Sequence, residues 1–380
     1  MKLLLVSMPS IHVTRWTTQL EHAGYEVYWF NINGTGANSK LPWVKQKVNW
    51  KLRWDYPGRI FLKKYLPSLY SMIQYVVSKD TATEFESYLK EIQPDVVHSF
   101  ALYVAAAPIV EVMERNTHIK WVYSSWGSDL YYFKEQPKYL KDIKRVLKRV
   151  DYLFTDCERD YKIAENLGFK GTFLGVFPGG GGFDFDSCDQ YIKPISKRSV
   201  ILVKGYQGRS GRAIPVLKAL NELSGELKDY QVVVFGADLE VESYLSICKP
   251  AYVIKVYSGL SFLSHRDIMR LMGNALIYIG NSNSDGMPNT LLEAICMGAF
   301  PIQSNPGGVT EEVIEHQKNG LLIEDCENVI HIKELIKTIL NNMKMIEDAQ
   351  EFNFKNLKPN YHQSKVKESV VKTYENLIRK

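Results

Sequence analysis

The sequence lacks the cysteine spacing of a disulfide framework or a zinc site. Five cysteines occur in 380 residues, without Cys-x-x-Cys pairs and without paired histidines nearby: Cys157, Cys188, Cys248, Cys296 and Cys326. Scattered cysteines of this kind are typical of free thiols in a reducing compartment. We therefore expect a cytoplasmic protein without structural disulfides.

Long hydrophobic runs are absent as well. The longest apolar region, residues 101–113, contains Pro108 and Glu111, and it is shorter than the roughly 20 residues that span a bilayer. The apolar run near the N-terminus covers only residues 3–6 before Pro9 interrupts it, which is too short for an export signal. We expect neither a membrane-crossing segment nor a signal peptide.

A large excess of one charge is also lacking. The chain has 47 basic and 42 acidic side chains, a net charge of +5, and this balance alone does not indicate a nucleic-acid partner. Neither half contains a Gly-x-Gly-x-x-Gly turn followed by an acid about 20 residues later. That absence argues against a nucleotide-binding dehydrogenase or epimerase, which stays open as an alternative because doubly wound sheets host many functions.

The sequence does contain a repeated alternation of short apolar strands and amphipathic helices. Its 380 residues are too many for one hydrophobic core and suit two domains. Strands are predicted at residues 2–7, 25–31, 95–98, 120–124, 152–155, 172–175, 199–204, 231–235, 252–255, 275–279, 299–303 and 321–324. Helices are predicted at residues 13–23, 84–92, 102–115, 138–148, 158–167, 213–223, 239–247, 264–272, 289–298, 330–341 and 362–378. This order predicts an α/β fold with parallel sheets covered by helices on both faces. The glycines at 179–182 break the pattern, and the polar residues 183–198 that follow are the predicted interdomain hinge.

Residues 284–308 combine a loop, a helix N-terminus and a glycine-rich turn. The predicted helix begins at Asn289, and its free N–H groups and positive dipole end favour a phosphate or pyrophosphate. Asp285 precedes the helix, and Glu293, about one turn into it, offers a carboxylate to two adjacent hydroxyls of a ribose. The turn at residues 305–308 brings further backbone N–H groups to the same place. Solvated carboxylates on an ordinary loop-helix-strand unit are the alternative interpretation.

Residues 204–213 open the second half of the chain with a strand end, a glycine-rich loop and a helix start. Glycines such as Gly205 let the backbone approach a pyrophosphate, and Lys204, Arg209 and Arg212 neutralise it without a metal ion. The sequence does not rank Arg209 against Arg212 as the ligand. A basic surface turn is the alternative interpretation.

The stretch 284–308 resembles the donor-binding signature of family 4 glycosyltransferases of GT-B fold. That signature has two acids spaced by seven residues, a Leu-Glu-Ala motif, a glycine, a strand with a proline and a Gly-Gly turn; here the first acid is Asp285 rather than Glu. The resemblance is strong over residues 199–324 and weak through the first half. It implies two Rossmann-like doubly wound domains facing across a cleft. The implied parts are an acceptor-binding domain at 1–185, a donor-binding domain at 186–357 and a helix at 358–380 that packs back on the first domain.

The resemblance also implies a retaining, metal-independent hexosyltransferase without a cofactor. Its nucleotide-sugar donor is UDP- or GDP-linked, and its acceptor is a hydroxyl of a glycan or lipid-linked molecule, as in lipopolysaccharide or capsule synthesis. The implied catalytic residues are Asp285, Asp129 and Lys204, and the implied donor-binding residues are Lys204, Arg209, Arg212, Glu293, Asn289, Thr290, Gly286 and Gly205. Tyr206 and Gly211 stand where the family usually has cations, and Trp126 stands where it has His. An inactive binding subunit on the same fold therefore stays open as a further alternative.

Two other acidic motifs need an interpretation. Asp129 ends the sequence Ser-Trp-Gly-Ser-Asp, which resembles the His-Gly-x-Asp loop of the family and implies a contact with an acceptor hydroxyl or the donor sugar. A turn or helix cap is the alternative for this residue. Asp184 and Asp186 spell the Asp-x-Asp triplet that holds a metal in the other large glycosyltransferase fold, but they lie in the hinge without a further acid or His ligand. We expect no metal site.

Residues 40–65 mix lysines and arginines with Trp, Tyr and Phe, against a single acid, Asp55. Such mixtures suit an anionic bilayer surface, where aromatic rings sit at headgroup depth. The predicted contacts are Lys45, Lys47, Lys51, Arg53, Trp50 and Trp54. We therefore expect a peripheral protein at the inner face of the cell membrane. Stacking on nucleic acid and a solvated loop that tucks its aromatics onto the first domain are the alternatives.

Overall fold

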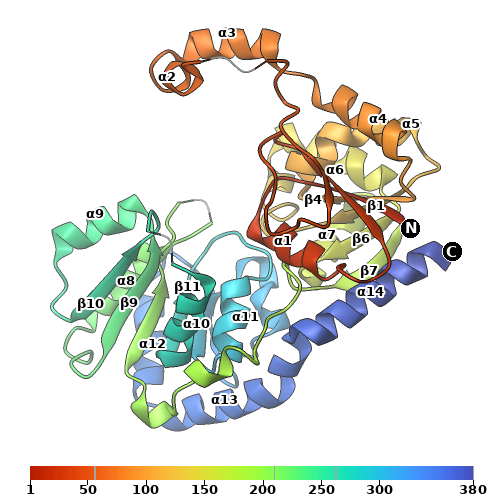
Figure 1. Ribbon diagram of the computed structural model, residues 1–380. Helices are drawn as coiled ribbons and strands as arrows, with labels where there is room; N and C mark the ends of the chain where they lie inside the picture. The colour runs from red at the N-terminus through yellow and green to blue at the C-terminus, as the bar shows by residue number, and fades with distance from the viewer. Residues whose placement is uncertain (55–56, 209, 262, 380) are drawn as a thin grey trace. The chain divides into compact units, whose positions relative to one another are not determined.

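The computed structural model describes residues 1–54, 57–208, 210–261 and 263–379, which form an α/β protein with two parallel sheets (Figure 1). The chain divides into two compact units, and the predicted fold class is confirmed. The first unit contains Met1–Asp156, Asp160–Gly181 and Ser369–Lys380, and the second contains Cys157–Arg159 and Gly182–Glu368. The main part of the first unit thus ends at Gly181, whereas the sequence analysis ended the first domain at residue 185. The chain returns to the first unit at Ser369, whereas the predicted C-terminal helix segment began at residue 358.

The sheet of the first unit has seven strands in the order β3-β2-β1-β4-β5-β6-β7. Every neighbouring pair is parallel, as the alternation of strands and helices predicts. The strands are β1 (Lys2–Ser7), β2 (Glu26–Asn31), β3 (Lys45–Lys47), β4 (Val96–Phe100), β5 (Lys120–Ser124), β6 (Tyr152–Thr155) and β7 (Thr172–Val176). The helices are α1 (Ile11–Thr18), α2 (Arg59–Tyr65), α3 (Pro67–Val77), α4 (Thr81–Ile92), α5 (Val110–Arg115), α6 (Pro137–Arg149) and α7 (Glu158–Asn166).

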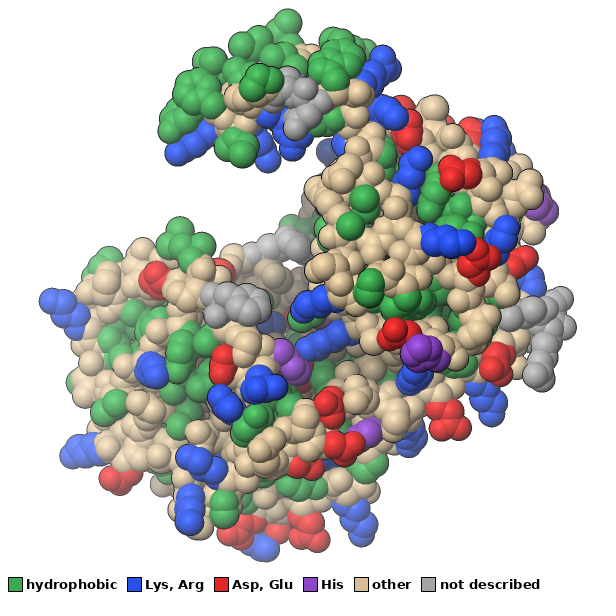
Figure 2. Space-filling model, viewed as in Figure 1, with side chains coloured by type: hydrophobic (Ala, Val, Ile, Leu, Met, Phe, Trp, Pro, Cys, Tyr) green, Lys and Arg blue, Asp and Glu red, His purple; other side chains and the backbone are tan. Residues whose placement is uncertain are grey.

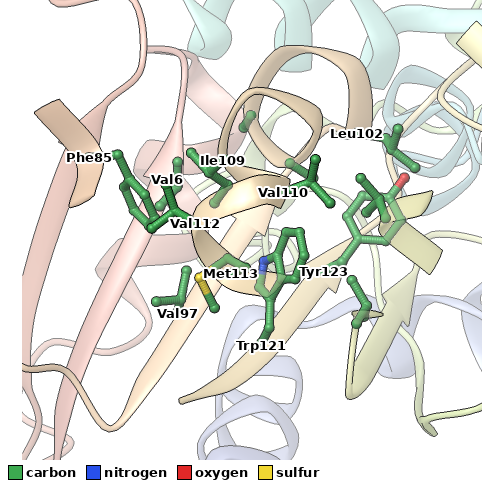
Figure 3. Close-up of a cluster of buried hydrophobic side chains, with 14 of the residues drawn as sticks. Val6, Phe85, Val97, Leu102, Ile109, Val110, Val112, Met113, Trp121 and Tyr123 are labelled. Atoms are coloured by element: carbon green, nitrogen blue, oxygen red, sulfur yellow. The ribbon is translucent and has the colours of Figure 1, made fainter. Parts of the chain in front are cut away.

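The core of the first unit forms where helices cover the central strands. Figure 3 shows Val97, Trp121 and Tyr123 from β4 and β5 in one cluster with Phe85 of α4 and Met113 of α5. All five side chains are buried. Burial of aromatic and branched side chains from both layers is the main force that holds this half of the chain together.

The segment predicted as one helix at residues 102–115 is irregular. It begins as a π-helical turn over Leu102–Ala106, tightens to a 3₁₀ turn over Ala107–Ile109 and becomes α-helical only at α5. Pro108 explains the break because proline lacks an N–H donor and its ring clashes with the carbonyl four residues earlier. The segment still covers the sheet, since Leu102, Ile109 and Val112 are fully buried.

The sheet of the second unit has six strands in the order β10-β9-β8-β11-β12-β13. Its neighbouring strands are also parallel. The strands are β8 (Val200–Lys204), β9 (Gln231–Ala237), β10 (Val253–Ser258), β11 (Ala275–Gly280), β12 (Phe300–Ser304) and β13 (Leu321–Ile323). The helices are α8 (Ala213–Glu222), α9 (Leu239–Cys248), α10 (His265–Asn274), α11 (Asn289–Cys296), α12 (Val329–Leu340), α13 (Met343–Asn356) and α14 (Gln363–Arg379).

Both faces of the second sheet are covered. Ile201 and Val203 of β8 belong to a buried cluster with α8 and α12, whereas Leu202 belongs to another with α10 and α11. Successive side chains of a strand point to opposite faces, so a strand buried on both sides reads as one apolar run. This is why the sequence predicts these strands well.

The C-terminal helix α14 passes from the second unit to the first, and its residues from Ser369 onward belong to the first unit. Tyr374 is fully buried there, and its hydroxyl accepts a hydrogen bond from Trp16 Nε1 at 3.1 Å. His98 is fully buried beside it, between Tyr374 and Ser124. His98 is therefore a core histidine of the first unit. Among the described residues, no helix is long and apolar enough to cross a membrane.

Candidate functional site

The polar residues that the sequence singles out in the second half gather at one edge of the second sheet. β8, β11 and β12 are parallel neighbours in the middle of that sheet, so their carboxyl ends share an edge. Ligands of doubly wound sheets bind at this edge. The loop after β8, the loop between β11 and α11, and the turn after β12 all begin there, and these three segments build the candidate site.

Lys204 and Asp285 lie next to each other at this edge. Lys204 ends β8, and its Nζ is 3.8 Å from Asp285 Oδ2, with 14% and 23% of the two side chains exposed. The same ammonium lies 4.8 Å from the ring centroid of Tyr206. An ammonium held between a carboxylate and an aromatic face is well placed for a second anion, because its charge is only partly compensated at this distance.

Gly205 sets the path of the loop after β8. A Cβ at this position would meet the Ala237 backbone at 2.7 Å and Val234 at 2.8 Å, distances that a real side chain does not reach. Its N–H donates to Phe235 O at 2.8 Å, and its carbonyl accepts from Asp238 N at 3.0 Å. The glycine thus holds the loop against β9, so its demonstrated role is close backbone packing.

The structure describes only one of the two arginines predicted in this loop, Arg212. Arg209 lies outside the described residues. Arg212 forms an ion pair with Glu327 through Nε, and its Nη1 donates to Gly211 O at 2.8 Å. Its backbone is fixed by Asn281, whose carbonyl accepts from the Arg212 N–H and whose Nδ2 donates to the Arg212 carbonyl. In this state the guanidinium of Arg212 is therefore occupied by a carboxylate.

Helix α11 begins at Asn289, as the sequence predicts. Its N-cap is Pro288, which makes no side-chain capping bond, and the first turn contains no acid. Thr290 in that turn is fixed by Tyr278, whose hydroxyl donates to Thr290 Oγ1 at 3.0 Å. A helix start without an acid in its first turn favours an anion, because no side-chain charge of the helix itself compensates the positive end of its dipole.

Glu293 is buried in the second turn of α11, and His265 holds it. The residue is 4% exposed, and His265 Nε2 lies 2.7 Å from its Oε1. A carboxylate only accepts, so the imidazole donates through Nε2. His265 is the first residue of α10, which Ser264 caps by accepting from Asp267 N. The cap was predictable from the sequence, but nothing in the sequence linked His265 to Glu293, 28 positions away.

The turn after β12 relies on two glycines in left-handed conformation, Gly307 with φ 64° and Gly308 with φ 80°. Residues with a Cβ rarely adopt such angles. Asn305 closes the turn, since its Oδ1 accepts from Thr310 N at 3.0 Å. The predicted Asn-Pro-Gly-Gly turn is therefore present at the same sheet edge as Lys204.

Arg159 is a residue of this region that the sequence analysis missed. It belongs to the second unit, where its guanidinium donates to the carbonyl oxygens of Pro306 at 2.6 Å and Asp285 at 2.8 Å. These bonds join the loop before α11 to the turn after β12. No motif marks the residue, because both of its acceptors are backbone carbonyls far along the chain.

Asp129 of the first unit does not have the environment expected of an acceptor contact. Its carboxylate is buried, and Oδ2 accepts hydrogen bonds from Leu102 N at 2.6 Å and from the Tyr123 hydroxyl at 2.7 Å. Burial raises the pKa of this carboxyl to about 7, against the lowering effect of the two hydrogen bonds. In the structure Asp129 thus caps the turn at Leu102, as the alternative interpretation expects, and its contact with an acceptor or a donor sugar stays a prediction.

The two acids of the Asp-x-Asp triplet have different partners, one local and one, His362, distant in the sequence. Asp184 accepts from the Ser187 hydroxyl at 2.8 Å, and Asp186 lies 3.5 Å from His362 Nε2. The only group of three potential metal ligands within the described ranges is elsewhere, at Asp156, Cys157 and Asp160. There Asp156 accepts from Gly127 N and Asp160 accepts from Ser125, so both acids brace the loop after β5.

The basic and aromatic stretch of the first unit only partly matches its prediction. Trp50 is 4% exposed, stacks on Phe30 with ring centroids 4.9 Å apart, and donates to Asn31 O. Its ring is therefore part of the core, which corrects the prediction that it contacts a membrane. Lys51 is half-buried and donates to Thr81 at 2.7 Å, whereas Trp54 is 54% exposed.

Lysines 45 and 47 also make contacts inside the first unit. Lys45 forms an ion pair with Glu26, and Lys47 lies 5.3 Å from the ring centroid of Tyr88. Both residues belong to β3, a strand that the sequence analysis did not predict. Arg53, next to the exposed Trp54, is itself exposed.

Comparison with known proteins agrees with this arrangement. Residues 194–355 match the family described as Glycosyl transferases group 1, and residues 78–157 match the family described as Glycosyl transferase 4-like. Spore coat protein SA of Bacillus subtilis is 26% identical over 167 residues, 42% of this chain and 44% of that protein. The matched region spans less than half the length of the curated relatives.

Solved structures resemble the chain over its whole length. Sucrose-phosphate synthase from Thermosynechococcus elongatus has a TM-score of 0.74 at 15% identity, covering 100% of this chain and 99% of that one. Anabaena HepE in complex with UDP-glucose has a TM-score of 0.70 at 10% identity, covering 99% of this chain and 100% of that one. At such identities the likeness shows a shared fold. The chain therefore has the GT-B fold, and its residues 194–355 are similar to the group 1 glycosyltransferases.

Proposed function

We propose that the chain transfers a glycosyl group from a nucleotide diphosphate sugar, UDP- or GDP-linked, to a hydroxyl of a glycan or lipid-linked acceptor. The match of residues 194–355 to the group 1 family supports the reaction class, and the solved HepE complex contains UDP-glucose. The observation that carries the proposal is the pair of Lys204 and Asp285, 3.8 Å apart at the sheet edge where α11 begins. A cation, a helix N-terminus and an acid meet there, as a sugar linked through a pyrophosphate requires.

The proposed reaction breaks the bond between the anomeric carbon and the oxygen of the outer phosphate. The bonding electrons leave with the nucleoside diphosphate, the acceptor oxygen forms the new bond, and the acceptor's proton passes to the departing phosphate oxygen. Negative charge therefore grows on the departing phosphate, and Lys204 and the N-terminus of α11 stabilise it. We propose that the acceptor attacks from the face that the phosphate leaves, so that the anomeric configuration is retained.

Asp285 and Glu293 take separate roles in this proposal. Asp285 lies beside Lys204 and contacts the donor sugar. Glu293 accepts hydrogen bonds from the two ribose hydroxyls, with its orientation set by His265. A carboxylate that is already held in place loses less conformational freedom when the donor binds, which favours affinity.

Release of the nucleoside diphosphate tests the proposal. We expect a panel of UDP- and GDP-sugars to contain one donor that yields free nucleoside diphosphate in the presence of the protein. For that donor, Lys204→Ala should lower kcat/KM about 30- to 1000-fold, since loss of a charge-assisted contact costs about 2–4 kcal/mol. Lys228→Ala, at an exposed lysine of the second unit, is the matched control.

The outcomes separate the competing functions. Wild-type turnover by Lys204→Ala would refute the assigned site. Donor binding without release by the wild type, even with acceptor glycans present, would indicate a non-catalytic binding subunit. Binding of a nicotinamide dinucleotide instead of a nucleotide sugar would indicate the dehydrogenase or epimerase alternative.

A further inference from the structure

Helices α2 and α3 form a hairpin whose apolar side chains are left uncovered by the rest of the described chain. α2 buries none of its residues, and α3 buries only Val77. Large hydrophobic side chains stand in solvent along both helices: Ile60 is 84% exposed, Phe61 58%, Met72 69%, Tyr75 91% and Val76 59%. Figure 2 shows the hydrophobic side chains gathered over this segment, with Lys and Arg side chains along one edge.

The exposed residues follow helical periodicity. Leu69, Met72 and Val76 are spaced by three and four positions, so they lie on one face of α3, and Phe61 and Tyr65 pair in the same way on α2, with ring centroids 4.8 Å apart. Soluble proteins bury such a face or use it for binding. The face is therefore organised, and the part of the chain that the structure describes does not cover it.

The hairpin leaves the first unit and returns to it at one place. Leu52 and Ser78 form an antiparallel bridge, Arg53 N donates to Val77 O at 2.9 Å, and Lys79 N donates to Lys51 O at 2.9 Å. Trp50, buried against Phe30, anchors the base of this neck. The hairpin thus starts and ends at one place, and its helices can meet a surface without any strand of the sheet leaving its position.

Charge indicates what covers the face. Residues 57–78 contain Arg59, Lys63 and Lys64 and no acid. If two hairpins paired symmetrically, these cations would face like charges, whereas an anionic surface neutralises them. Phe, Tyr, Leu and Ile side chains beside lysines are also the composition of helices that lie in a membrane interface.

We propose that the α2–α3 hairpin inserts its apolar face into the surface of an anionic lipid bilayer. Its helices have 7 and 11 residues, about 10 and 16 Å at 1.5 Å per residue, so they lie in the interface instead of crossing it. The exposed side chains enter the headgroup and upper acyl region, and Lys63 and Lys64 contact lipid phosphates. This inference adds a location to the proposed transfer to a lipid-linked acceptor, and it moves the membrane contact from residues 45–54 to the hairpin.

Vesicle binding of the full chain tests the inference without any donor or acceptor. The wild type is mixed with vesicles of phosphatidylcholine alone or with phosphatidylglycerol, at low and high ionic strength, and sedimented. We expect it to pellet with the anionic vesicles at low ionic strength and to be released by salt. Each basic residue near the surface is worth about 1 kcal/mol, about fivefold in partitioning, so exchange of Lys63 and Lys64 for Glu should weaken binding at least about 30-fold.

Matched variants distinguish membrane binding through the hairpin from nonspecific binding to vesicles. Ile60→Ser, Met72→Ser and Tyr75→Ser together should abolish sedimentation with vesicles. Leu239→Ser, Ile247→Ser and Leu260→Ser, at side chains 62%, 81% and 81% exposed in the second unit, should not. Lys141→Glu with Lys144→Glu, two exposed lysines of α6, reproduces the charge change of Lys63→Glu with Lys64→Glu elsewhere and should leave binding unchanged.

Three results would overturn the inference. The wild type staying in solution with anionic vesicles at low ionic strength is one, and equal sedimentation of the hairpin variants is another. The third combines two observations: neither the wild type nor the variant with Ser at Ile60, Met72 and Tyr75 binds vesicles, and analytical ultracentrifugation shows a dimer for the wild type but a monomer for the variant. The exposed face would then bind a second copy of the chain. Nucleoside diphosphate release without vesicles is measured in parallel, so a failed reaction is distinguished from failed membrane binding.

Discussion

His265 donates a hydrogen bond from Nε2 to Oε1 of Glu293 across 2.7 Å, joining the first residue of α10 to the second turn of α11. Glu293 is 4% exposed, whereas 36% of the His265 side chain is exposed. The imidazole therefore closes the solvent side of a carboxylate that is otherwise inside the second unit. We assign His265 as a positioning residue for Glu293.

His265→Ala should raise the KM for the nucleotide-sugar donor about tenfold with a smaller change in kcat. The reason is that the lost bond orients Glu293, which in the proposed function holds the ribose in both the ground and transition states. A hydrogen bond to a charged group is worth about 1.5–3 kcal/mol. Steady-state kinetics of His265→Ala, Glu293→Gln and the double variant measure the coupling. Once Glu293 is changed to Gln, the His265 substitution should cause little further change in the KM for the donor. His118→Ala, at an exposed histidine, is the control, and equal additive losses would contradict the assignment.

Glycosyl transfer should persist in a chelator, because the cationic side chain of Lys204 and the N-terminus of α11 neutralise the leaving group in the proposed reaction. Asp184→Asn with Asp186→Asn should keep wild-type activity as well. The measurement is nucleoside diphosphate release with and without EDTA, before and after addition of manganese. Activity that the chelator abolishes and manganese restores would contradict this expectation, and its loss in the double variant would place the metal at the Asp-x-Asp triplet.

Asp129 should make the free energy of unfolding fall as the pH rises from about 4 to about 7. Burial raises the pKa of its carboxyl from 3.8 to about 7, so in this window the folded state binds more protons than the unfolded state. The contribution of the Asp129 carboxyl to the free energy of unfolding is fully present at pH values below 3.8 and is lost as the pH rises through 7. The slope of this loss is at most about 1.4 kcal/mol per pH unit.

Urea unfolding of Asp129→Asn across that window checks this prediction. The amide keeps an oxygen that accepts from Leu102 N and from the Tyr123 hydroxyl but does not titrate, so the variant should lose part of the slope. Asp142→Asn, at an exposed carboxylate, should keep the wild-type slope. Parallel curves for Asp129→Asn and the wild type would show that the carboxyl titrates in its ordinary range.

Arg198→Met should destabilise the second unit by about 2–4 kcal/mol. The guanidinium is buried and donates to three backbone carbonyls, Lys193 O at 2.7 Å, Ala275 O at 3.0 Å and Gly298 O at 2.7 Å. Methionine fills much of the volume but removes this donor from the three carbonyls, of which Gly298 O keeps a hydrogen bond from Gln350 Nε2, and loss of hydrogen bonds to buried acceptors is costly.

The midpoint of urea unfolding measures this change, with Lys197→Met as the exposed neighbouring control. Burial lowers the pKa of Arg198 to about 10, which leaves the guanidinium charged at neutral pH. The stability of Arg198→Lys should lie between those of the wild type and Arg198→Met. The ammonium of lysine donates from a single nitrogen, whereas the three carbonyls are arranged around a planar group with several N–H donors. A variant as stable as the control would show that water replaces the guanidinium.

The sequence by itself determined the alternation of most strands and helices, the parallel sheets and the helix start at Asn289, but it did not show β3, α2, α3 or α13. These features depend on local patterns, because a strand buried on both faces must be apolar throughout and a helix that follows a Gly-Pro loop needs no distant partner. Lys204 and Asp285 were also found from the sequence, since both stand at the carboxyl ends of such strands or just after them.

The tertiary structure alone decided which polar and aromatic side chains face inward. Asp129 turned inward because Leu102 and Tyr123 supply its hydrogen bonds, and Trp50 turned inward because Phe30 offers a ring to stack on. The pairing of His265 with Glu293 likewise joins residues on different helices. The exposed face of α2 and α3 belongs here too: apolar periodicity predicts that a helix face is covered, but only the arrangement of the other elements shows whether the chain itself covers it.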